Sequence, residues 1–128
     1  SRFEPETLST YEGDFSFESG FQGASELLRS HRDLTAVVGM NNMMTLGILQ
    51  YCRLRDIEVP GDVSVAGYGT IEYRDLMYVQ PTMVTQDAWR IGTRVGELIL
   101  DRLQHSVTAN REIVFDSIID AGNTVAAV

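Results

Sequence analysis

The sequence predicts an α/β protein built on a Rossmann-like open sheet of mostly parallel strands. Short, continuous apolar runs alternate along the chain with stretches whose apolar residues recur at helical spacing. Continuous runs of this kind are typical of strands that are buried on both faces, as in parallel sheets. With 128 residues, of which 44% are hydrophobic and 22% are charged, the chain is also long enough to form one packed core.

The first half of the chain is expected to form two strands and two helices. In order, they are a weak strand at 8–12, a helix at 17–30, a buried strand at 35–40 and a helix at 42–55. Asn41 and Asn42 precede the second helix, and either residue can cap it. This helix carries apolar residues on nearly every side, so we expect it to bury two faces.

The second half is expected to add three strands and one helix. In order, the expected elements are a turn at 59–62, a strand at 63–67, a loop at 68–80, a strand at 82–85, a helix at 87–104 and a strand at 113–119. Gly92 and Gly96 lie inside the helix, where a glycine costs about 1 kcal/mol relative to alanine. We therefore expect another element to approach them closely. Alternation of strands and helices predicts helices on both faces of the sheet.

Composition excludes several classes of function. The chain carries 18 acidic and 10 basic residues, a net charge of -8, which disfavours nucleic-acid binding by this segment. One cysteine excludes an internal disulfide and a cysteine-rich zinc site. No apolar run is long enough to span a membrane. We expect no metal, no cofactor and no membrane partner, and the missing initiator Met suggests a piece of a longer polypeptide.

Catalytic motifs are scarce in this sequence. His31 and His105 fall at the ends of predicted helices, where an imidazole suits the helix dipole. Cys52 falls inside an apolar helix, so we expect it to be buried and unreactive. An α/β enzyme that uses Asp14, Asp87 or His105 remains an alternative function.

Polar and aromatic residues gather where the predicted strands end. These residues are Asp14, Phe15, Asn41, Asn42, Tyr68, Gly69, Gln86 and Asp87. In open α/β sheets, ligands bind beyond the carboxyl ends of the strands. Aromatic faces and amides suit a neutral, hydroxyl-rich small molecule. The alternatives are that Asn42 and Asp87 only cap helices, and that Phe15 is a core aromatic.

Several collinear motifs resemble the effector domain of lactose/galactose-repressor (LacI/GalR) transcription regulators. They are EGDF (12–15), SGF (19–21), LL (27–28), TAVV (35–38), NNMM (41–44), LG (46–47), VPGDVSV (59–65), GY (67–68), QPT (80–82) and TQD (85–87) with Gly92. Each motif alone is weak, but together they run from about Gly13 to Leu103 and are specific.

The resemblance implies a type I periplasmic-binding-protein-like fold. In that fold two Rossmann-like lobes hold the effector between them, after a helix-turn-helix that binds DNA. Residues 1–86 would form most of the C-terminal lobe, 87–119 a crossover helix and strand of the N-terminal lobe, and 120–128 a return segment. The rest of the N-terminal lobe and the DNA-binding headpiece would be absent, so DNA would be a partner only through that headpiece.

The resemblance also implies a ligand site at Phe15, Asn41, Tyr68, Gly69 and Gln86. Phe15 matches the aromatic that stacks on the effector, and Asn41 matches a polar contact at a strand end. Gly69 departs from the family, because many members carry an Asp there that binds the ligand. Two further departures are Asn42, in place of an Asp, and residues 121–123, in place of Arg-x-Ser.

A homodimer is expected from burial and from the resemblance together. One sheet can hide only one face of the helix at 42–55, which would leave its other apolar face in water. The expected interface residues are Met44, Gly47, Ile48, Tyr51, Leu76 and Tyr78. Exchange of the C-terminal helix between copies is an alternative way to cover apolar surface.

The predicted function is binding of a sugar or sugar-like effector, and dimerisation, as part of a cytoplasmic LacI-type regulator without enzymatic activity. A bound effector would favour one arrangement of the two lobes and so change the spacing of distant DNA-binding heads. The alternative is a sugar-binding protein of an ABC importer, which shares the fold.

Overall fold

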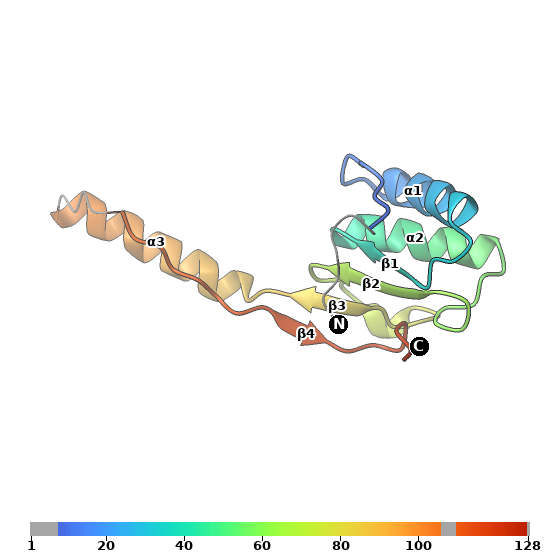
Figure 1. Ribbon diagram of the computed structural model, residues 1–128. Coiled ribbons are helices and arrows are strands. Elements are labelled where there is room, and N and C mark those ends of the chain that lie inside the picture. Colours follow the sequence, from blue (N-terminus) through green and yellow to red (C-terminus); the bar gives the residue numbers. More distant parts are fainter. Residues whose placement is uncertain (1–7, 106–109, 128) are drawn as a thin grey trace.

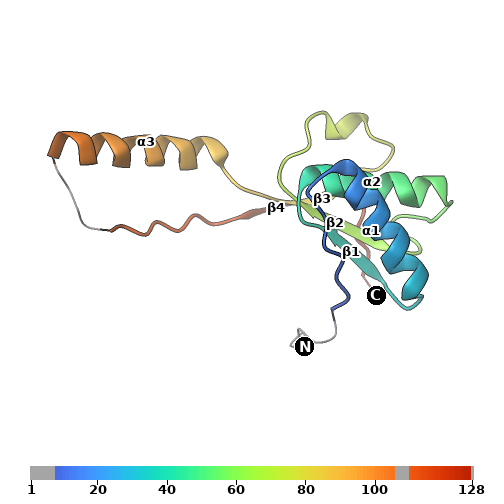
Figure 2. The ribbon, with the colours of Figure 1, turned by 90° about the horizontal axis from the view of Figure 1, so that it is seen from above.

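The computed structural model describes residues 8–105 and 110–127 as a sheet domain with a projecting arm (Figure 1). Its elements are α1 (Phe17–Ser30), β1 (Ala36–Gly39), α2 (Asn42–Leu54), β2 (Ser64–Tyr68), the short 3-10 helix η2 (Arg74–Leu76), β3 (Thr82–Thr85), α3 (Ala88–His105) and β4 (Ile118–Asp120). The arm consists of α3 and the chain at 110–117, which runs back toward the domain (Figures 1 and 2).

The four strands form one open sheet in the order β1-β2-β3-β4. β1 and β2 pair in parallel with Ala36 opposite Ser64, and β2 and β3 pair in parallel with Ala66 opposite Thr82. β4 is antiparallel to β3. The predicted α/β class with a mainly parallel sheet is therefore confirmed, and the carboxyl ends of β1, β2 and β3 lie at one edge.

Local capping defines the limits of α1. The Ser16 hydroxyl accepts a hydrogen bond from the Ser19 N–H at 3.0 Å, which satisfies one of the free donors in the first helical turn. At the other end, the His31 N–H donates to the Leu27 carbonyl at 2.9 Å. These contacts explain why the helix observed here matches the predicted range, and they confirm His31 at its C-terminus.

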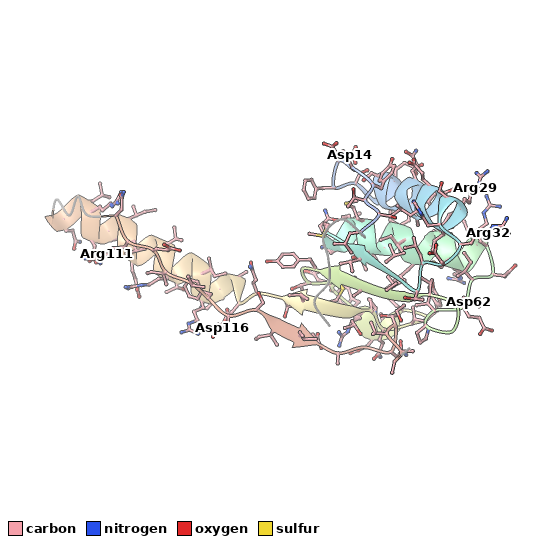
Figure 3. The ribbon with its side chains drawn as sticks, viewed as in Figure 1. Asp14, Arg29, Arg32, Asp62, Arg111 and Asp116 are labelled. Atoms are coloured by element: carbon pink, nitrogen blue, oxygen red, sulfur yellow. The ribbon has the colours of Figure 1, made fainter. Side chains whose placement is uncertain are left out.

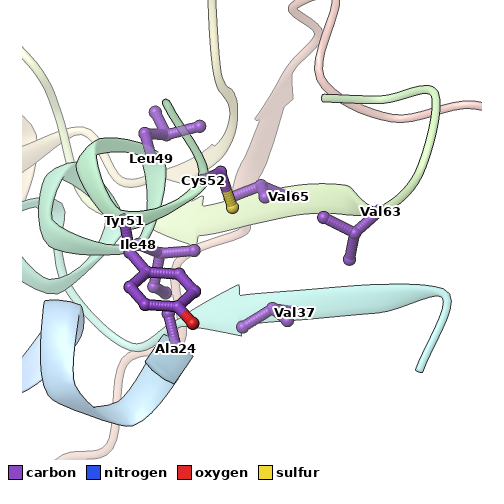
Figure 4. Close-up of a cluster of buried hydrophobic side chains, with 8 residues drawn as sticks. All are labelled: Ala24, Val37, Ile48, Leu49, Tyr51, Cys52, Val63 and Val65. Carbon is purple, nitrogen blue, oxygen red and sulfur yellow. The ribbon is translucent and has the colours of Figure 1, made fainter. Parts of the chain in front are cut away.

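The core lies between the sheet and α2, and it continues between α2 and α1 (Figure 4). Its buried side chains are Ala24, Val37, Ile48, Leu49, Tyr51, Cys52, Val63 and Val65. The Tyr51 ring meets the Phe21 ring of α1 edge-on, with 5.3 Å between their centroids. Burial of each large apolar side chain contributes about 1.5–3 kcal/mol, so this cluster supplies much of the folding free energy.

Two glycines let α1 and α2 pack with their backbones almost in contact. A Cβ added at Gly47 would clash with the Phe17 carbonyl and would lie 2.7 Å from the Phe21 nitrogen. A Cβ at Gly20 would lie 2.5 Å from the Met44 Cα. Real Cβ atoms do not approach backbone this closely, so the helix pair requires glycine at both positions.

α1 covers the outer face of α2, so α2 does not need a second copy of the chain to bury that face. Gly47, Ile48 and Tyr51 are buried within the single chain, and Tyr51 is only 4% exposed. The assignment of these three residues to a dimer interface is therefore wrong. The sequence pattern correctly indicated two buried faces, but the covering element is α1 rather than another protomer.

Five expectations about the elements also need correction. Residues 8–12 form no strand, and of the expected strand at 113–119 only its end pairs, as β4. The predicted burial of both faces at 35–40 is wrong, since Val38 is exposed while Val37 is buried. α1 and α2 lie on the same side of the sheet rather than on opposite faces (Figure 1). The loop at 68–80 contains η2.

An apolar hollow runs along the outer edge of β1, where the structure shows no paired strand among the described residues. It measures about 330 Å³ and lies between residues 8–11 on one side and Ala36, Val37 and Val38 on the other, beneath α1. Residues 8–11 therefore stand beside the sheet without pairing to it, which explains why their strand-like sequence forms no strand here.

The arm leaves much of its apolar surface exposed. Val95, Ile99 and Leu103 of α3 are all exposed, although they recur at the helical spacing that is typical of a buried face. Nothing described lies within 4 Å of a Cβ placed at Gly92 or Gly96, so no element approaches them closely in this structure. No helix in the described ranges, α3 included, is long and apolar enough to cross a membrane.

Arg74 joins the loop at 69–80 to the two strands that lead to and from the arm. Its guanidinium contacts both carboxylate oxygens of Asp120 in β4, at 2.9 and 3.0 Å. It also donates to the carbonyl of Pro81, immediately before β3, at 3.3 Å. Bidentate pairing of this kind fixes orientation as well as distance, so the loop is held in one position against β3 and β4.

We expect Gly47→Ala to lower the free energy of unfolding by about 1–3 kcal/mol, because the added methyl group forces α1 away from α2. Urea denaturation followed by circular dichroism measures this change.

Gly92→Ala in α3 is the matched control. Nothing described surrounds Gly92, and alanine favours the helix by about 1 kcal/mol, so this variant should be neutral or more stable. A Gly47→Ala protein as stable as Gly92→Ala would contradict the close packing of the two helices.

Candidate functional site

Four segments meet at the edge of the sheet where the parallel strands end. They are the loop before α1, the β1–α2 junction, the segment after β2 and the end of β3. The arm leaves the domain at this same edge (Figures 1 and 2). The structure thus brings the predicted residues Phe15, Asn41, Tyr68, Gly69 and Gln86 to one edge of the sheet, beside the root of the arm.

Asn41 holds two of these segments together. Its amide oxygen accepts from the Met44 N–H at 2.7 Å and so caps α2. Its amide nitrogen donates to the Phe15 carbonyl at 2.8 Å. One side chain therefore begins the helix and also fixes the backbone of the loop that carries the predicted stacking residue.

Asn42 performs the same task for the segment after β2. Its amide nitrogen donates to the Thr70 carbonyl at 3.0 Å, and its oxygen accepts from the Met43 N–H at 2.9 Å. Asn41 rather than Asn42 is the helix cap, so the alternative that Asn42 only caps the helix is wrong. Asn42 instead positions the loop.

Gly69 has a backbone conformation that favours glycine. Its φ is +96°, in the left-handed half of the map, and its N–H donates to the Val84 carbonyl at 2.9 Å. A Cβ placed there would lie no closer than 3.8 Å to other atoms, those of Asn42. The space above Gly69 is therefore open to a ligand.

Three side chains remain available at this edge. Phe15 is 65% exposed and Met40 is 63% exposed, while Tyr68 is half-buried. The alternative that Phe15 is a core aromatic is therefore wrong. Phe15 has a φ of +66°, an uncommon value for a residue with a side chain, and the hydrogen bond from Asn41 helps to hold it there.

The carboxylates named as possible catalytic groups have structural partners. Asp14 accepts from the Ser16 N–H at 3.0 Å, and hydrogen bonds from the Ser16 side chain, its backbone N–H and Ser19 lower the Asp14 pKa to about 2. Asp87 accepts from the Arg90 N–H at 2.9 Å, as a helix cap does. Neither is placed as a general acid, and the side chain of His105 lies outside the described residues.

Cys52 is fully buried, as the sequence predicted, and this burial raises its thiol pKa to about 11. A thiol in that state is a poor nucleophile. In the part of the chain that the structure describes, no three histidine, cysteine, aspartate or glutamate side chains lie close enough together to hold a metal ion.

Sequence reasoning missed Met40 and Thr70 at this edge. Met40 ends an apolar run, which places it in the strand expected to be buried, but the alternating burial of β1 turns it outward. Strand alternation applied to residues 36–40 could have found it. Nothing in the sequence indicates that the Thr70 carbonyl bonds to Asn42.

Residues 4–124 match the family described as periplasmic binding protein-like domain. The chain belongs to this family. It is 33% identical over 95 residues to the HTH-type transcriptional repressor PurR of Actinobacillus pleuropneumoniae, an alignment that covers 73% of this chain and 28% of the repressor. It is 31% identical over 112 residues to the HTH-type transcriptional regulator CelR of Thermobifida fusca, which covers 88% of this chain and 33% of the regulator.

Solved structures of LacI-family regulators share the fold. A CelR–cellobiose complex superposes with a TM-score of 0.82 at 26% identity, over 91% of this chain and 37% of that one. A LacI-family regulator from Enterococcus faecium with bound ribose gives 0.77 at 25% identity, over 88% of this chain and 41% of that one. The resemblance to LacI-type effector domains, and the type I periplasmic-binding-protein-like fold that it implied, are confirmed.

The chain spans about a third of the length of these curated relatives. Those relatives are transcriptional regulators rather than enzymes.

We expect the Asp14 carboxylate to titrate with a pKa of about 2, below its ordinary value of 3.8, in a ¹³C NMR titration. Ser16→Ala should raise this pKa, because the Ser16 side chain contributes the largest effect. A native pKa below the unfolded one means that ionised Asp14 favours folding above about pH 4 and loses this effect as the pH falls toward 2.

Ser25→Ala, on the same helix but away from Asp14, is the control and should leave the titration unchanged. An Asp14 pKa near 3.8 in the unaltered protein would show that the hydrogen bonds around it do not form in solution.

Proposed function

We propose that this chain is the effector-binding and dimerising portion of a LacI-type transcriptional regulator that acts in the cytoplasm and has no enzymatic activity. The observation that supports the proposal is the arrangement at the edge of the sheet where the parallel strands end, which we call the strand-end edge. There, Asn41 and Asn42 hold the neighbouring loops in place, and Phe15 and Tyr68 lie beside Gly69, above which there is open space. Effectors of this fold class bind at such an edge.

The arm supports the division into lobes that the sequence suggested. We assign residues 1–86 to the C-terminal lobe, 87–119 to the N-terminal lobe and 120–128 to the return segment. β3 leads out to α3 and β4 leads back, side by side with β3 (Figure 1). Exposed Val95, Ile99 and Leu103 would then pack against the rest of the N-terminal lobe in a longer protein. DNA would be contacted only by a headpiece outside this segment.

A sugar-binding protein of an ABC importer is the second candidate, because it shares the fold. The curated relatives are transcriptional repressors and regulators, which favours the regulator. A helix-turn-helix encoded upstream in the same reading frame would decide for the regulator, and a secretion signal would decide for the importer.

We propose that the chain dimerises through the loop at 69–80. The outer face of α2 is not part of this interface, because α1 covers it. Leu76 is 84% exposed at the tip of this loop, and Arg74 fixes the loop on one side. On the other side the Tyr78 hydroxyl donates to the Leu49 carbonyl at 2.8 Å, and the Arg53 guanidinium lies 5.1 Å from the Tyr78 ring centre. Met44 is half-buried against α1 and can contribute little.

We expect a neutral sugar or sugar-like effector to raise the thermal stability of the full-length protein that contains this chain. A ligand at 100 times its Kd adds about 2.7 kcal/mol to the free energy of unfolding. A thermal-shift panel of ribose, cellobiose and nucleosides tests the proposal, and Phe15→Ala should weaken the binding found by about tenfold, because the stacking surface is lost.

Phe15→Ala should leave the unliganded melting temperature unchanged, since Phe15 is exposed and its backbone is held by Asn41. Unaltered affinity in this variant would remove Phe15 from the site, and turnover of a panel compound that is lost on Asp87→Ala would favour an enzyme.

We expect Leu76→Glu to shift the protein from dimer to monomer in sedimentation equilibrium. Burial of a leucine contributes about 1.5–3 kcal/mol, and a carboxylate in its place would be desolvated.

Leu54→Glu, at the end of α2, is the matched control because Leu54 is also exposed but lies outside the loop. A Leu76→Glu protein that remains dimeric would place the interface elsewhere.

A further inference from the structure

We infer that Thr45 is a positioning residue for the effector site, although it is fully buried and does not touch the effector. Its hydroxyl holds the junction of Asn41 and Asn42, whose side chains in turn hold the loops at the strand-end edge. The inference rests on the proposed function, because it concerns the same site. It is supported by the surroundings of Thr45, by the group that its hydroxyl bonds, and by what that group is connected to.

The Thr45 side chain fills a notch between two glycines. Gly39 and Gly67 lie opposite each other where β1 and β2 pair. A Cβ added at either glycine would clash with the Thr45 hydroxyl oxygen, and one at Gly67 would also lie 2.8 Å from the Thr45 Cγ2. Real Cβ atoms do not come this close to other atoms. The first turn of α2 therefore rests directly on the backbone of both strands, near their carboxyl ends.

Within the notch, the hydroxyl bonds the carbonyl of Asn41. It donates to this oxygen at 2.7 Å, and the Thr45 N–H donates to the same oxygen at 3.0 Å. The N–H bond is the ordinary bond of the first helical turn, so the bond from the hydroxyl is additional. Two donors from one buried residue fix the direction of the Asn41 carbonyl more closely than the helical bond alone.

The direction of this carbonyl matters at the strand-end edge. Because a peptide unit is planar, a fixed Asn41 carbonyl also fixes the Asn42 N–H on the other side of the bond. Among the described residues this N–H has no hydrogen-bond partner, and its nitrogen lies 3.8 Å from the position of a Cβ at Gly69. The Asn41 side chain on the same unit holds the Phe15 carbonyl. A shift of the junction would therefore move a donor beside the open space and the loop before α1 together.

The packing role of Thr45 and its positioning role belong to different atoms. The methyl group fills the notch at Gly67, whereas only the hydroxyl bonds the Asn41 carbonyl. Valine keeps the branched shape and loses the bond, and serine keeps the bond and loses the methyl group. The two substitutions therefore distinguish a site weakened by lower stability of the domain from a site whose junction has moved.

Hydrogen–deuterium exchange of the unliganded full-length protein tests the positioning directly. Thr45→Val should speed exchange several-fold in peptides that cover 13–19 and 40–44, because the junction and the loop that it holds become looser. Thr45→Ser should exchange there as the unaltered protein does. Peptides around Arg29 and Arg32, at the opposite end of α1 from Asp14 (Figure 3), should exchange alike in all three proteins.

Isothermal titration calorimetry with ribose, cellobiose and adenosine tests the consequence for binding. A probe that binds the unaltered full-length protein should bind Thr45→Val about tenfold more weakly, the upper range for one hydrogen bond, and should bind Thr45→Ser with nearly unchanged affinity. Melting temperatures should follow the opposite order, because serine leaves a small cavity at Gly67 and valine does not. A merely structural role would make affinity follow stability.

Thr124→Val is the matched control. Thr124 is also 0% exposed, and its hydroxyl donates to the Val65 carbonyl at 2.6 Å and accepts from the Thr82 N–H at 2.9 Å. These bonds lie toward the amino ends of β2 and β3, away from the strand-end edge. This variant should melt at a lower temperature than the unaltered protein and bind the same probe with the same affinity.

Equal weakening of binding by Thr45→Val and Thr45→Ser, or unchanged exchange at 13–19 and 40–44 in Thr45→Val, overturns the inference and leaves the proposed function standing. If none of the three probes binds the unaltered protein, both fail.

Discussion

The amide of Asn41 is the contact on which the strand-end edge depends. It closes the first turn of α2 at Met44, and it reaches 26 residues back along the chain to hold the carbonyl of Phe15. Without the cap, α2 would begin later and the β1–α2 junction would lose its shape. Without the second bond, the loop before α1 would lose the contact that helps to hold Phe15 in a left-handed conformation. Local helix geometry and the long-range geometry of the site are thus set by one side chain.

The packing of α1 on α2 gives this junction a rigid base. Because Gly20 and Gly47 have no side chains, the backbones of the two helices approach each other closely. The Tyr51 ring of α2 packs edge-on against the Phe21 ring of α1 beside this contact. Both helices begin at the strand-end edge, so the loops that precede them are held at a fixed separation. A site formed by loops gains precision when the elements that carry them cannot slide.

The arm, unlike the packed pair of helices, makes few contacts with the rest of the described chain. α3 touches little besides the returning chain at 110–117, and most of its apolar residues face solvent. Its connection to the domain is nevertheless firm, because β4 pairs with β3 and Arg74 holds both strands. A crossover between two lobes would need a firm connection to the first lobe and an apolar surface that is free to pack against the second. In the two-lobed regulator that we propose, movement of one lobe relative to the other would act on these paired strands, and Arg74 would transmit it to the loop that carries Leu76.

The sequence by itself determined the helices, the three parallel strands and the class of fold, because capping residues and apolar periodicity act over a few residues. It also placed Phe15, Asn41 and Gly69 together at one edge of the sheet, since the carboxyl ends of parallel strands must meet there. Tertiary structure alone decided which element covers α2. Periodicity shows that Tyr51 is buried, but not whether α1 or another protomer buries it. Likewise, residues 8–12 have a strand-like pattern but lack a paired neighbour, and a strand exists only where backbone hydrogen bonds can form.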